Sequence, residues 1–300
     1  MSPATSDFTD DLRLAHVLAD DADSITTTRF RALDLHVMSK PDLTPVTDAD
    51  HGVEESIRRT LSRVRSRDAV LGEEQGSTGH SQRRWVVDPI DGTKNFVRGV
   101  PVWASLISLM VDDEVVVGVV SAPMLQRRWW ASKDGGAWTG RSLLKATECH
   151  VSDVSRLDDA SLSYSSFTDW DEHDKLDAFL ALARRVWRTR AYGDFWSYML
   201  LAEGAVDLAA EPELELYDMA ALDVIVREAG GRFSSLDGTP GPNGGNALAS
   251  NGRLHDQALA FLGSLPDDAD DPDVAPRRPG SLHDLSSRRR SAAQERPDHE

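Results

Sequence analysis

Apolar residues in the first half of the chain follow two different spacings. Between residues 10 and 30 they recur every three or four positions, which predicts a helix with one buried face. The same spacing predicts a second helix over residues 51–64, and two prolines make the intervening residues 40–50 a loop. Runs of β-branched and aromatic residues predict buried strands, including one hairpin, over residues 69–71, 85–87, 104–111, 114–122 and 127–132.

In the second half, shorter strands alternate with helices. Helical spacing marks residues 173–187, 192–204, 218–229 and a last stretch that ends at Leu262. Short apolar runs predict strands at residues 149–152, 161–165, 206–210 and 246–250. From Pro266 onward aliphatic residues become scarce, which predicts a disordered tail. We therefore divide the chain into an N-terminal α+β half, a C-terminal α/β half and a tail, over residues 1–145, 146–265 and 266–300.

Composition narrows the choice of partners. The formal net charge of −17 argues against a nucleic-acid partner, because binding a nucleic-acid backbone needs a basic surface. Cys149 is the only cysteine, so neither a disulfide framework nor a cysteine-rich metal site can form within the chain. No apolar run approaches the roughly 20 residues of a membrane span, and the polar N-terminus lacks a signal-peptide pattern. We therefore expect a cytoplasmic protein with no membrane partner.

The segment Asp88-Pro89-Ile90-Asp91 follows the predicted strand at residues 85–87. Proline has no N–H to donate, so we expect it to end the strand ladder and the four residues to form a tight turn. The first and fourth Cα atoms of such a turn lie within about 7 Å, which brings the two carboxylates together. Paired carboxylates repel each other, and a hard divalent cation with its preference for oxygen ligands would neutralise them. Gly92 and Thr93 follow, and they suit the close approach of a phosphate at the start of a helix.

Acidic residues also stand at three further junctions between predicted elements. Glu73 follows a strand, Asp218 begins a helix, and Asp50 precedes a helix. Carboxylates at such ends are typical of active sites in layered α/β proteins. Each has a simpler explanation as well, since Asp48 or Asp50 suits a helix cap and Asp218 a helix N-terminus stabilised by the dipole. The aspartate-rich string described above is the more specific signal.

The chain resembles the inositol monophosphatase superfamily, the magnesium-dependent and lithium-sensitive phosphatases of sugars and inositols. The resemblance covers about residues 10–262 and is carried by motifs at residues 45–50, 72–74, 88–96, 217–220 and 228–231. Of these, Asp-Pro-Ile-Asp-Gly-Thr-Lys-Asn-Phe is the most specific. Tyr217 stands where the family usually has Trp, which retains an aromatic side chain. The resemblance implies an α/β fold, a five-layer αβαβα sandwich with metals at the junction of its two halves.

The resemblance also implies a set of ligands. Two or three Mg²⁺ ions are expected, with Mn²⁺ as a substitute and Li⁺ as an inhibitor. One ion would be held by Glu73, Asp88 and the Ile90 carbonyl. A second would be held by Asp88, Asp91 and Asp218, and a third would be touched through water by Asp50. Phosphate or substrate contacts are implied for Gly92, Thr93, Asn95 and Asp218, and catalytic roles for Glu73, Asp91 and Thr93.

This metal set predicts a mechanism. Bound Mg²⁺ would neutralise the phosphate dianion, orient it for in-line attack, and lower the pKa of a bound water. Glu73 and the Thr93 hydroxyl would accept or relay the proton of that water, and the ion held by Asp218 would stabilise the leaving alkoxide. Monoester hydrolysis is among the slowest uncatalysed reactions, so the site must supply about 20 kcal/mol or more.

Two further acids indicate the leaving group. Asp194 follows Gly193, and Glu211 precedes Asp218 at the spacing of the family's substrate contact. Their surroundings, Gly-Asp-Phe-Trp-Ser-Tyr and Ala-Ala-Glu, resemble the actinobacterial branch of the family that acts on histidinol phosphate. This ester carries an ammonium and an imidazole, which two carboxylates can bind by charge-assisted hydrogen bonds. We expect it to be the substrate, in histidine biosynthesis, with Arg190 as a further contact; the simpler explanation for Asp194 is a helix cap.

Three other functions stay open. An inositol-1-phosphatase or a sugar phosphatase of broad specificity would share the same motifs. A catalytically inactive metal-binding scaffold would not need to retain all of the implied ligands. A nucleotide 3′-phosphatase would need basic groups for a second phosphate, for which Lys94, Arg98 and Arg190 are candidates. Members of the resembled family are commonly homodimers, and we expect the same here.

Overall fold

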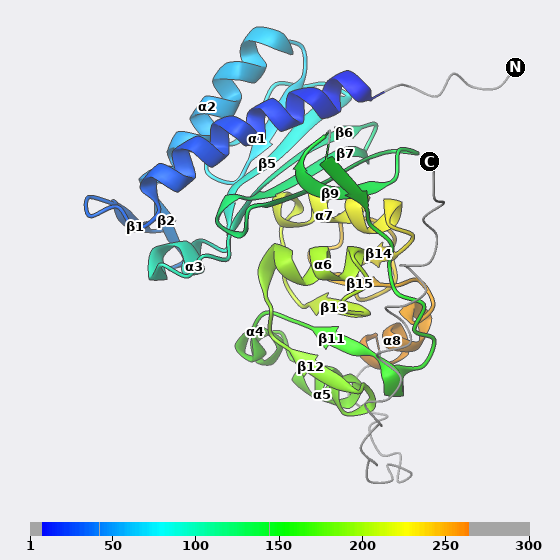
Figure 1. Cartoon of the computed structure of the whole chain (residues 1–300). Coiled ribbons are helices and arrows are strands. Elements are labelled where there is room, and N and C mark those ends of the chain that lie inside the picture. Colours follow the sequence, from blue (N-terminus) through cyan, green and yellow to red (C-terminus); the bar gives the residue numbers. More distant parts are fainter. Residues whose placement is uncertain (1–7, 42, 144, 264–300) are drawn as a thin grey trace, which may run out of the picture. The chain divides into compact units, whose positions relative to one another are not determined.

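The computed structural model describes residues 8–41, 43–143 and 145–263, and five layers stack within them (Figure 1). The helices of these layers are α1 (Thr9–Arg29), α2 (Asp48–Val64), α5 (Leu176–Arg185), α6 (Asp194–Ala202), α7 (Leu216–Glu228) and α8 (His255–Leu262). Helices α1 and α2 cover one face of an eight-stranded sheet, and α6 and α7 lie between this sheet and a five-stranded one. Helices α5 and α8 form the last layer, so the predicted α/β five-layer sandwich is confirmed.

The larger sheet is mostly antiparallel, with the strand order β10-β9-β8-β7-β6-β5-β3-β4. Its strands are β3 (Ala69–Gly72), β4 (Gly76–Thr78), β5 (Arg83–Asp91), β6 (Ala104–Val111), β7 (Glu114–Ala122), β8 (Arg127–Ser132), β9 (Ala137–Ser142) and β10 (Lys145–Glu148). Only β3 and β5 pair in parallel, and they carry Glu73, Asp88 and Asp91 at or just beyond their carboxyl ends. The short helix α3 (Thr93–Arg98) follows β5 directly.

The smaller sheet has the strand order β12-β11-β13-β15-β14. Its strands are β11 (Ser161–Ser163), β12 (Arg188–Arg190), β13 (Leu208–Glu211), β14 (Arg232–Ser234) and β15 (Ala247–Ser250). Strand β11 pairs in parallel with both β12 and β13, so the carboxyl ends of these three strands lie at one edge of the sheet. Two elements flank this framework, the hairpin of β1 (Val37–Ser39) with β2 (Pro45–Thr47) and the short helix α4 (Phe167–Glu172).

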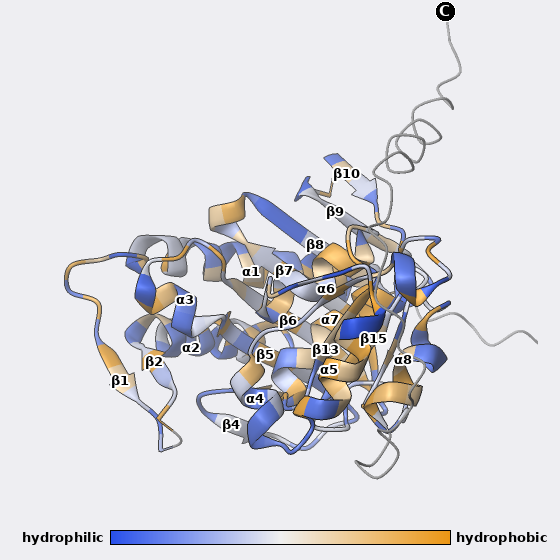
Figure 2. Cartoon of the chain, turned by 90° about the horizontal axis from the view of Figure 1, so that it is seen from below, coloured by the Kyte–Doolittle hydropathy of each residue, from blue (hydrophilic) through white to orange (hydrophobic). Residues whose placement is uncertain are grey.

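The core is built on both faces of β5. Trp85 and Val87 are fully buried on the face that packs against α1 and α2, whereas Val86 is buried on the face toward α7. This alternation is the period of two that a strand imposes on its side chains. Because both faces are covered, the strand reads in the sequence as an uninterrupted apolar run. Hydrophobic colouring gathers on the central layer around α6 and α7 (Figure 2).

Helix α7 sits directly on strand β7 at Gly118. A Cβ atom at Gly118 would lie 2.5 Å from Cγ1 of Val224 and 2.8 Å from the carbonyl oxygen of Ala221. Glycine is therefore the only residue that permits this approach of helix and strand. The contact sets the height of α7 above the sheet, and α7 carries Asp218 in its first turn.

The segment from Asp88 to Asp91 differs from its prediction. Strand β5 continues to Asp91, which pairs with Ala104 beyond an irregularity in the register, so the predicted end of the ladder at Pro89 and the tight turn are wrong. The irregularity explains why proline is tolerated, since a bulge needs no N–H at that position. The Pro89 carbonyl accepts a hydrogen bond from the Ser105 hydroxyl (2.6 Å). The strand therefore changes direction locally without ending.

Several predicted boundaries are also corrected. The predicted loop 40–50 contains β2, and α2 begins at Asp48 instead of residue 51. Residues 149–152 are not a strand, because the ladder ends with β10. The helix predicted over residues 173–187 is shorter than expected, since α5 spans only Leu176–Arg185. The separate helix α4 before it was not predicted, and Asp174 lies in the left-handed region between the two (φ 54°). Six further strands, all carrying polar residues, were not predicted: β1, β4, β9, β10, β12 and β14.

The predicted division of the chain stays a prediction. The last strand of the larger sheet ends at Glu148, and the first strand of the smaller sheet begins at Ser161. A boundary between residues 145 and 146 would therefore pass through β10. The tail predicted over residues 266–300 lies outside the described residues.

Candidate active site

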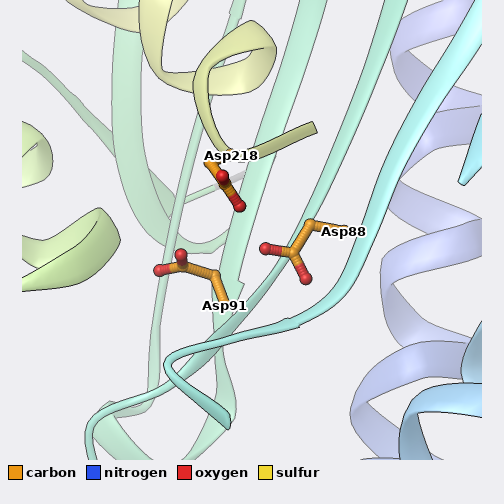
Figure 3. A group of neighbouring side chains, drawn as sticks. All are labelled: Asp88, Asp91 and Asp218. Carbon is orange, nitrogen blue, oxygen red and sulfur yellow. The ribbon is translucent and has the colours of Figure 1, made fainter. Parts of the chain in front are cut away.

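Three aspartates converge at the bulge in β5, which lies between Asp88 and Asp91. Asp88 and Asp91 come from that strand, and Asp218 comes from the first turn of α7 (Figure 3). Each contributes a carboxylate oxygen, and the three oxygens lie within 4.8 Å of one another. Local hydrogen bonds hold two of them, since Asp88 Oδ1 accepts from the Ile90 N–H (2.9 Å) and Asp218 Oδ2 from the Glu215 N–H (2.8 Å). The predicted meeting of these three side chains is therefore present in the structure.

Electrostatics make this cluster unfavourable without a cation. Burial raises the pKa of Asp88 well above its usual range, and the charges of Glu73 and Asp91 raise it further. Burial also raises the pKa of Asp91, followed by the charges of Asp194 and Asp218. The pKa of Asp218 rises to about 7, chiefly through burial, although the Glu215 N–H opposes the rise. Hard divalent cations prefer such sets of carboxylate oxygens, so these residues fit a metal of that class.

A hydroxyl and a buried carboxylate lie beside the cluster. The Thr93 hydroxyl donates to the Ile90 carbonyl (2.8 Å) and lies 3.4 Å from Asp50 Oδ1. Asp50 Oδ2 accepts from both the N–H (2.8 Å) and the hydroxyl (2.5 Å) of Thr47. Thr47 is the N-cap of α2, and Asp50 completes a capping box from the third helical position, so the prediction of Asp50 or Asp48 as the cap is corrected. Burial nevertheless raises the pKa of Asp50 to about 6, against the hydrogen bonds from Thr47.

Lys40 was not predicted as a site residue. Its ammonium lies 2.5 Å from Glu73 Oε1 and 2.8 Å from Glu74 Oε1. Burial alone would lower the pKa of Lys40, but these two carboxylates outweigh burial and raise it. The Glu73 carboxylate is thus bound by a lysine in this structure. It also lies close enough to Asp88 to raise the pKa of that residue. The lysine lies in a predicted loop, where no spacing or motif relates it to a carboxylate 33 positions away.

The two acids predicted for the leaving group come from the other half of the fold. Glu211 ends β13, and Asp194 begins α6 just beyond the end of β12. Asp194 is not a cap: Gly193 occupies the N-cap position, and Asp194 Oδ2 accepts instead from Asn95 Nδ2 (3.2 Å). A Cβ atom at Gly92 would lie 3.2 Å from the same oxygen. The carboxylate of Asp194 therefore faces the residues that follow β5.

The same two acids have raised pKa values. Burial raises the pKa of Asp194 to about 6, although the Lys94 charge opposes the rise. Burial raises that of Glu211 to about 8, with a hydrogen bond from Ser165 acting against it. The backbone also connects this region to the aspartate cluster, because the Phe195 N–H donates to Asp91 Oδ2 (2.7 Å).

The structure does not bring every predicted residue to the site. The Arg190 side chain is exposed, and its guanidinium donates to the Thr189 carbonyl (2.7 Å). Asn95 contacts Asp194 and the Val102 carbonyl (3.0 Å), so its amide positions a carboxylate in this structure. Ser165 and Tyr198, which lie next to Glu211, were not predicted as site residues. Ser165 belongs to no recognisable motif, whereas Tyr198 ends the Gly-Asp-Phe-Trp-Ser-Tyr string but was assigned no role there.

A five-layer α/β sandwich with converging carboxylates at the end of a buried strand is the arrangement that the sequence motifs predicted for a metal-dependent phosphatase. The chain matches the model of the inositol monophosphatase family over residues 10–264. The chain therefore belongs to the inositol monophosphatase family, which is metal-dependent.

Within residues 8–41, 43–143 and 145–263, no helix has both the length and the apolar character needed to cross a membrane.

Individual relatives narrow the comparison. The chain is 65% identical over 260 residues to a histidinol-phosphatase of Streptomyces coelicolor, covering 85% of this chain and 98% of that protein. It is 59% identical over 254 residues to a histidinol-phosphatase of Mycobacterium tuberculosis, covering 84% and 98%. Among solved structures, an inositol monophosphatase from Zymomonas mobilis superposes with a TM-score of 0.76 at 34% identity, covering 86% of this chain and 100% of that one.

Proposed function

We propose that the protein hydrolyses L-histidinol phosphate to L-histidinol and phosphate, as a metal-dependent phosphoric monoester hydrolase of histidine biosynthesis. The observation that carries the proposal is a pair of acids beside the aspartate cluster, the half-buried Asp194 and the buried Glu211. High identity to two histidinol-phosphatases over most of the chain supports the same substrate.

The proposed metal ligands are Asp88, Asp91, Asp218, Glu73 and the Ile90 carbonyl, with Asp50 near a further ion. We propose Mg²⁺ as the natural metal, two or three ions per site, with Mn²⁺ as a substitute and Li⁺ as an inhibitor. When bound, Mg²⁺ neutralises phosphate charge and lowers the pKa of water. The oxygen-only donor set and its raised pKa values support a hard cation of this kind.

Residues of the chain supply the proton transfer and the phosphate contacts. The Thr93 hydroxyl lies between a backbone carbonyl and Asp50, so it can pass a proton from the attacking water toward that carboxylate. Asp50 is the carboxylate that would take up this proton. Glu73 can do the same once its carboxylate leaves Lys40. Gly92 permits close approach of the phosphate, and its neighbours Thr93 and Asn95 complete the contact.

The leaving group is selected by charge. Histidinol carries an ammonium and an imidazole. Asp194 and Glu211 offer it two carboxylates from the ends of β12 and β13, the strands on either side of β11. An inositol ring offers only hydroxyl groups, so it would give neither acid a cationic partner. Arg190, which is exposed in this structure, stays a predicted substrate contact.

The test is a comparison of substrates. We expect phosphate release from histidinol phosphate in Mg²⁺ to exceed that from inositol 1-phosphate by about 100-fold or more, since two charge-assisted contacts separate the substrates. Adding Li⁺ should inhibit both reactions. Equal rates would instead indicate a broad sugar or inositol phosphatase, and no phosphate release from any ester would indicate an inactive scaffold.

The expected homodimer and cytoplasmic location stay predictions. Light scattering coupled to size exclusion tests the first, and a fluorescent fusion in the native cell tests the second.

A further inference from the structure

Ser165 connects the two acids of the leaving-group region. It lies two residues beyond the end of β11, between the ends of β12 and β13 at the shared sheet edge. Its hydroxyl donates to Glu211 Oε2 (2.6 Å) and accepts from the Asp194 N–H (3.0 Å). One hydroxyl therefore joins the carboxylate of one acid to the backbone of the other.

Glu211 retains one carboxylate oxygen for another donor. The residue is only 7% exposed, and among the described residues its Oε1 atom has no hydrogen-bonding partner. The Tyr198 hydroxyl lies beside it, close enough to lower its pKa, but outside the geometry of a hydrogen bond. A buried acceptor without a donor is costly to the fold, so this oxygen fits the N–H group of a bound ligand.

The backbone of Asp194 needs support from its neighbours. Its φ of 48° lies in the left-handed region, which is rare for a residue other than glycine, and Gly193 before it has a φ of 80°. Two contacts hold this conformation, the hydroxyl of Ser165 at the N–H and the amide of Asn95 at Oδ2. A Cβ atom at Gly193 would make only an ordinary contact with the Ser165 hydroxyl oxygen (3.9 Å), so glycine suits this position because of its positive φ.

We propose that Ser165 is a positioning residue that selects a cationic leaving group by fixing the separation of Asp194 and Glu211. It holds Glu211 Oε2, which leaves Oε1 as the oxygen that meets the ligand. At the same time it fixes the main chain from which the Asp194 carboxylate extends. This role rests on the proposed function, because it requires a leaving group that carries two nitrogen donors.

The test compares Ser165→Ala with Ser166→Ala. Ser166 is the adjacent serine, and its hydroxyl only caps α4 by accepting from the Thr168 N–H (3.1 Å). We expect Ser165→Ala to raise KM for histidinol phosphate about 10-fold, the loss of roughly one charge-assisted hydrogen bond, with kcat nearly unchanged. KM for glycerol 2-phosphate, whose leaving group is uncharged, should change less than about two-fold. Ser166→Ala should change neither value.

Two more variants separate positioning from a purely structural role. Ser165→Thr keeps the hydroxyl and should restore most of the affinity for histidinol phosphate. In a Glu211→Gln background, removing the serine hydroxyl should cause a much smaller further loss of preference, because its charged partner is already gone. Thermal melting of each variant shows whether it folds. If Ser165→Ala alone does not fold, the comparison of Glu211→Gln with the Glu211→Gln, Ser165→Ala double variant still tests the role of the serine.

The outcomes are distinct. A wild-type enzyme without preference for histidinol phosphate overturns the proposed function. A wild-type preference that Ser165→Ala leaves intact overturns the role of Ser165 alone. An equal rise in KM for both esters, without rescue by Ser165→Thr, also overturns it, since the serine would then support the fold and not the selection.

Discussion

Replacing Asp218 by asparagine tests whether the aspartate cluster stores electrostatic repulsion. Asparagine has nearly the same shape, and its carbonyl oxygen can still accept the Glu215 N–H that holds the first turn of α7. The substitution removes one negative charge from three converging carboxylates. Without metal, we therefore expect Asp218→Asn to stabilise the protein at neutral and higher pH, which is unusual for a change at a candidate active site.

The size and sign follow from the pKa of Asp218. Its pKa is 3.8 in the absence of the fold and about 7 in the folded protein. Between these values the folded state binds more protons than the unfolded state, so the free energy of unfolding falls as pH rises. At about 1.4 kcal/mol for each pKa unit, the ionised carboxylate costs up to roughly 4 kcal/mol at pH 8. This value is an upper bound, because burial is the main cause of the raised pKa, and solvent screens part of its cost at a half-buried side chain.

Asp223→Asn is the matched control on the same helix. Asp223 is buried, whereas Asp218 is half-buried, and both oxygens of Asp223 accept from Arg227 (2.9–3.1 Å). Removing a charge from a buried ion pair leaves its partner uncompensated and destabilises the protein, by about 3 kcal/mol. The same substitution on α7 is therefore expected to have opposite effects at the two positions.

The assay is thermal melting in a chelator and in Mg²⁺, between pH 5 and 8. In chelator we expect the wild type to lose stability with rising pH, and Asp218→Asn to lose less. Mg²⁺ at about 100 times its Kd should stabilise the wild type by about 2.7 kcal/mol, or roughly 5–10 °C, and the variant by much less. Asp223→Asn should keep the full metal response. A metal-free Asp218→Asn protein that melts below the wild type at pH 8 would show that the Asp218 charge does not destabilise the fold.

Other substitutions test the surrounding residues. Thr93→Val should lower kcat for phosphate release about 100-fold with little change in melting temperature, since the hydroxyl contacts only a carbonyl and one carboxylate; Thr93→Ser should retain most activity. Gly92→Ala should lower the free energy of unfolding by about 1–2 kcal/mol, because glycine has a φ of 83° there and a Cβ atom would press on Asp194. Unchanged unfolding in denaturant would contradict this expectation. Lys40→Met should tighten Mg²⁺ binding several-fold in calorimetry, since the ammonium occupies Glu73 without metal; weaker binding would argue against competition.

The local part of the site could be predicted from the sequence. Asp88, Asp91 and Thr93 lie within six positions, so any conformation of that segment keeps them close. The proximity of Asp218, 127 positions beyond Asp91, came from the family resemblance and not from the pattern of residues. Pro89 was misread because the rule that proline ends a ladder does not hold at a bulge.

The tertiary contacts could not be predicted. Lys40 and Ser165 act through partners that lie 33 and 46 positions away and only the packed sheets bring them together. Helix boundaries shifted for a similar reason, since Thr47 caps α2 through a box that needs both Thr47 and Asp50. Strongly periodic apolar segments such as α1 and the hairpin of β6 with β7 were located well, because burial alone decides them.

A substitution at Gly118 would act on the metal site from a distance. Any side chain there would push α7 away from β7, and the helix would carry Asp218 with it. The distance between that carboxylate and the two on β5 would increase, although no metal ligand had changed. A substitution of Gly118 would therefore resemble a loss of metal in an activity assay, and excess Mg²⁺ would restore part of the lost rate. We therefore expect Gly118, a residue without a side chain in the middle of a sheet, to influence the affinity for the metal through the position of α7.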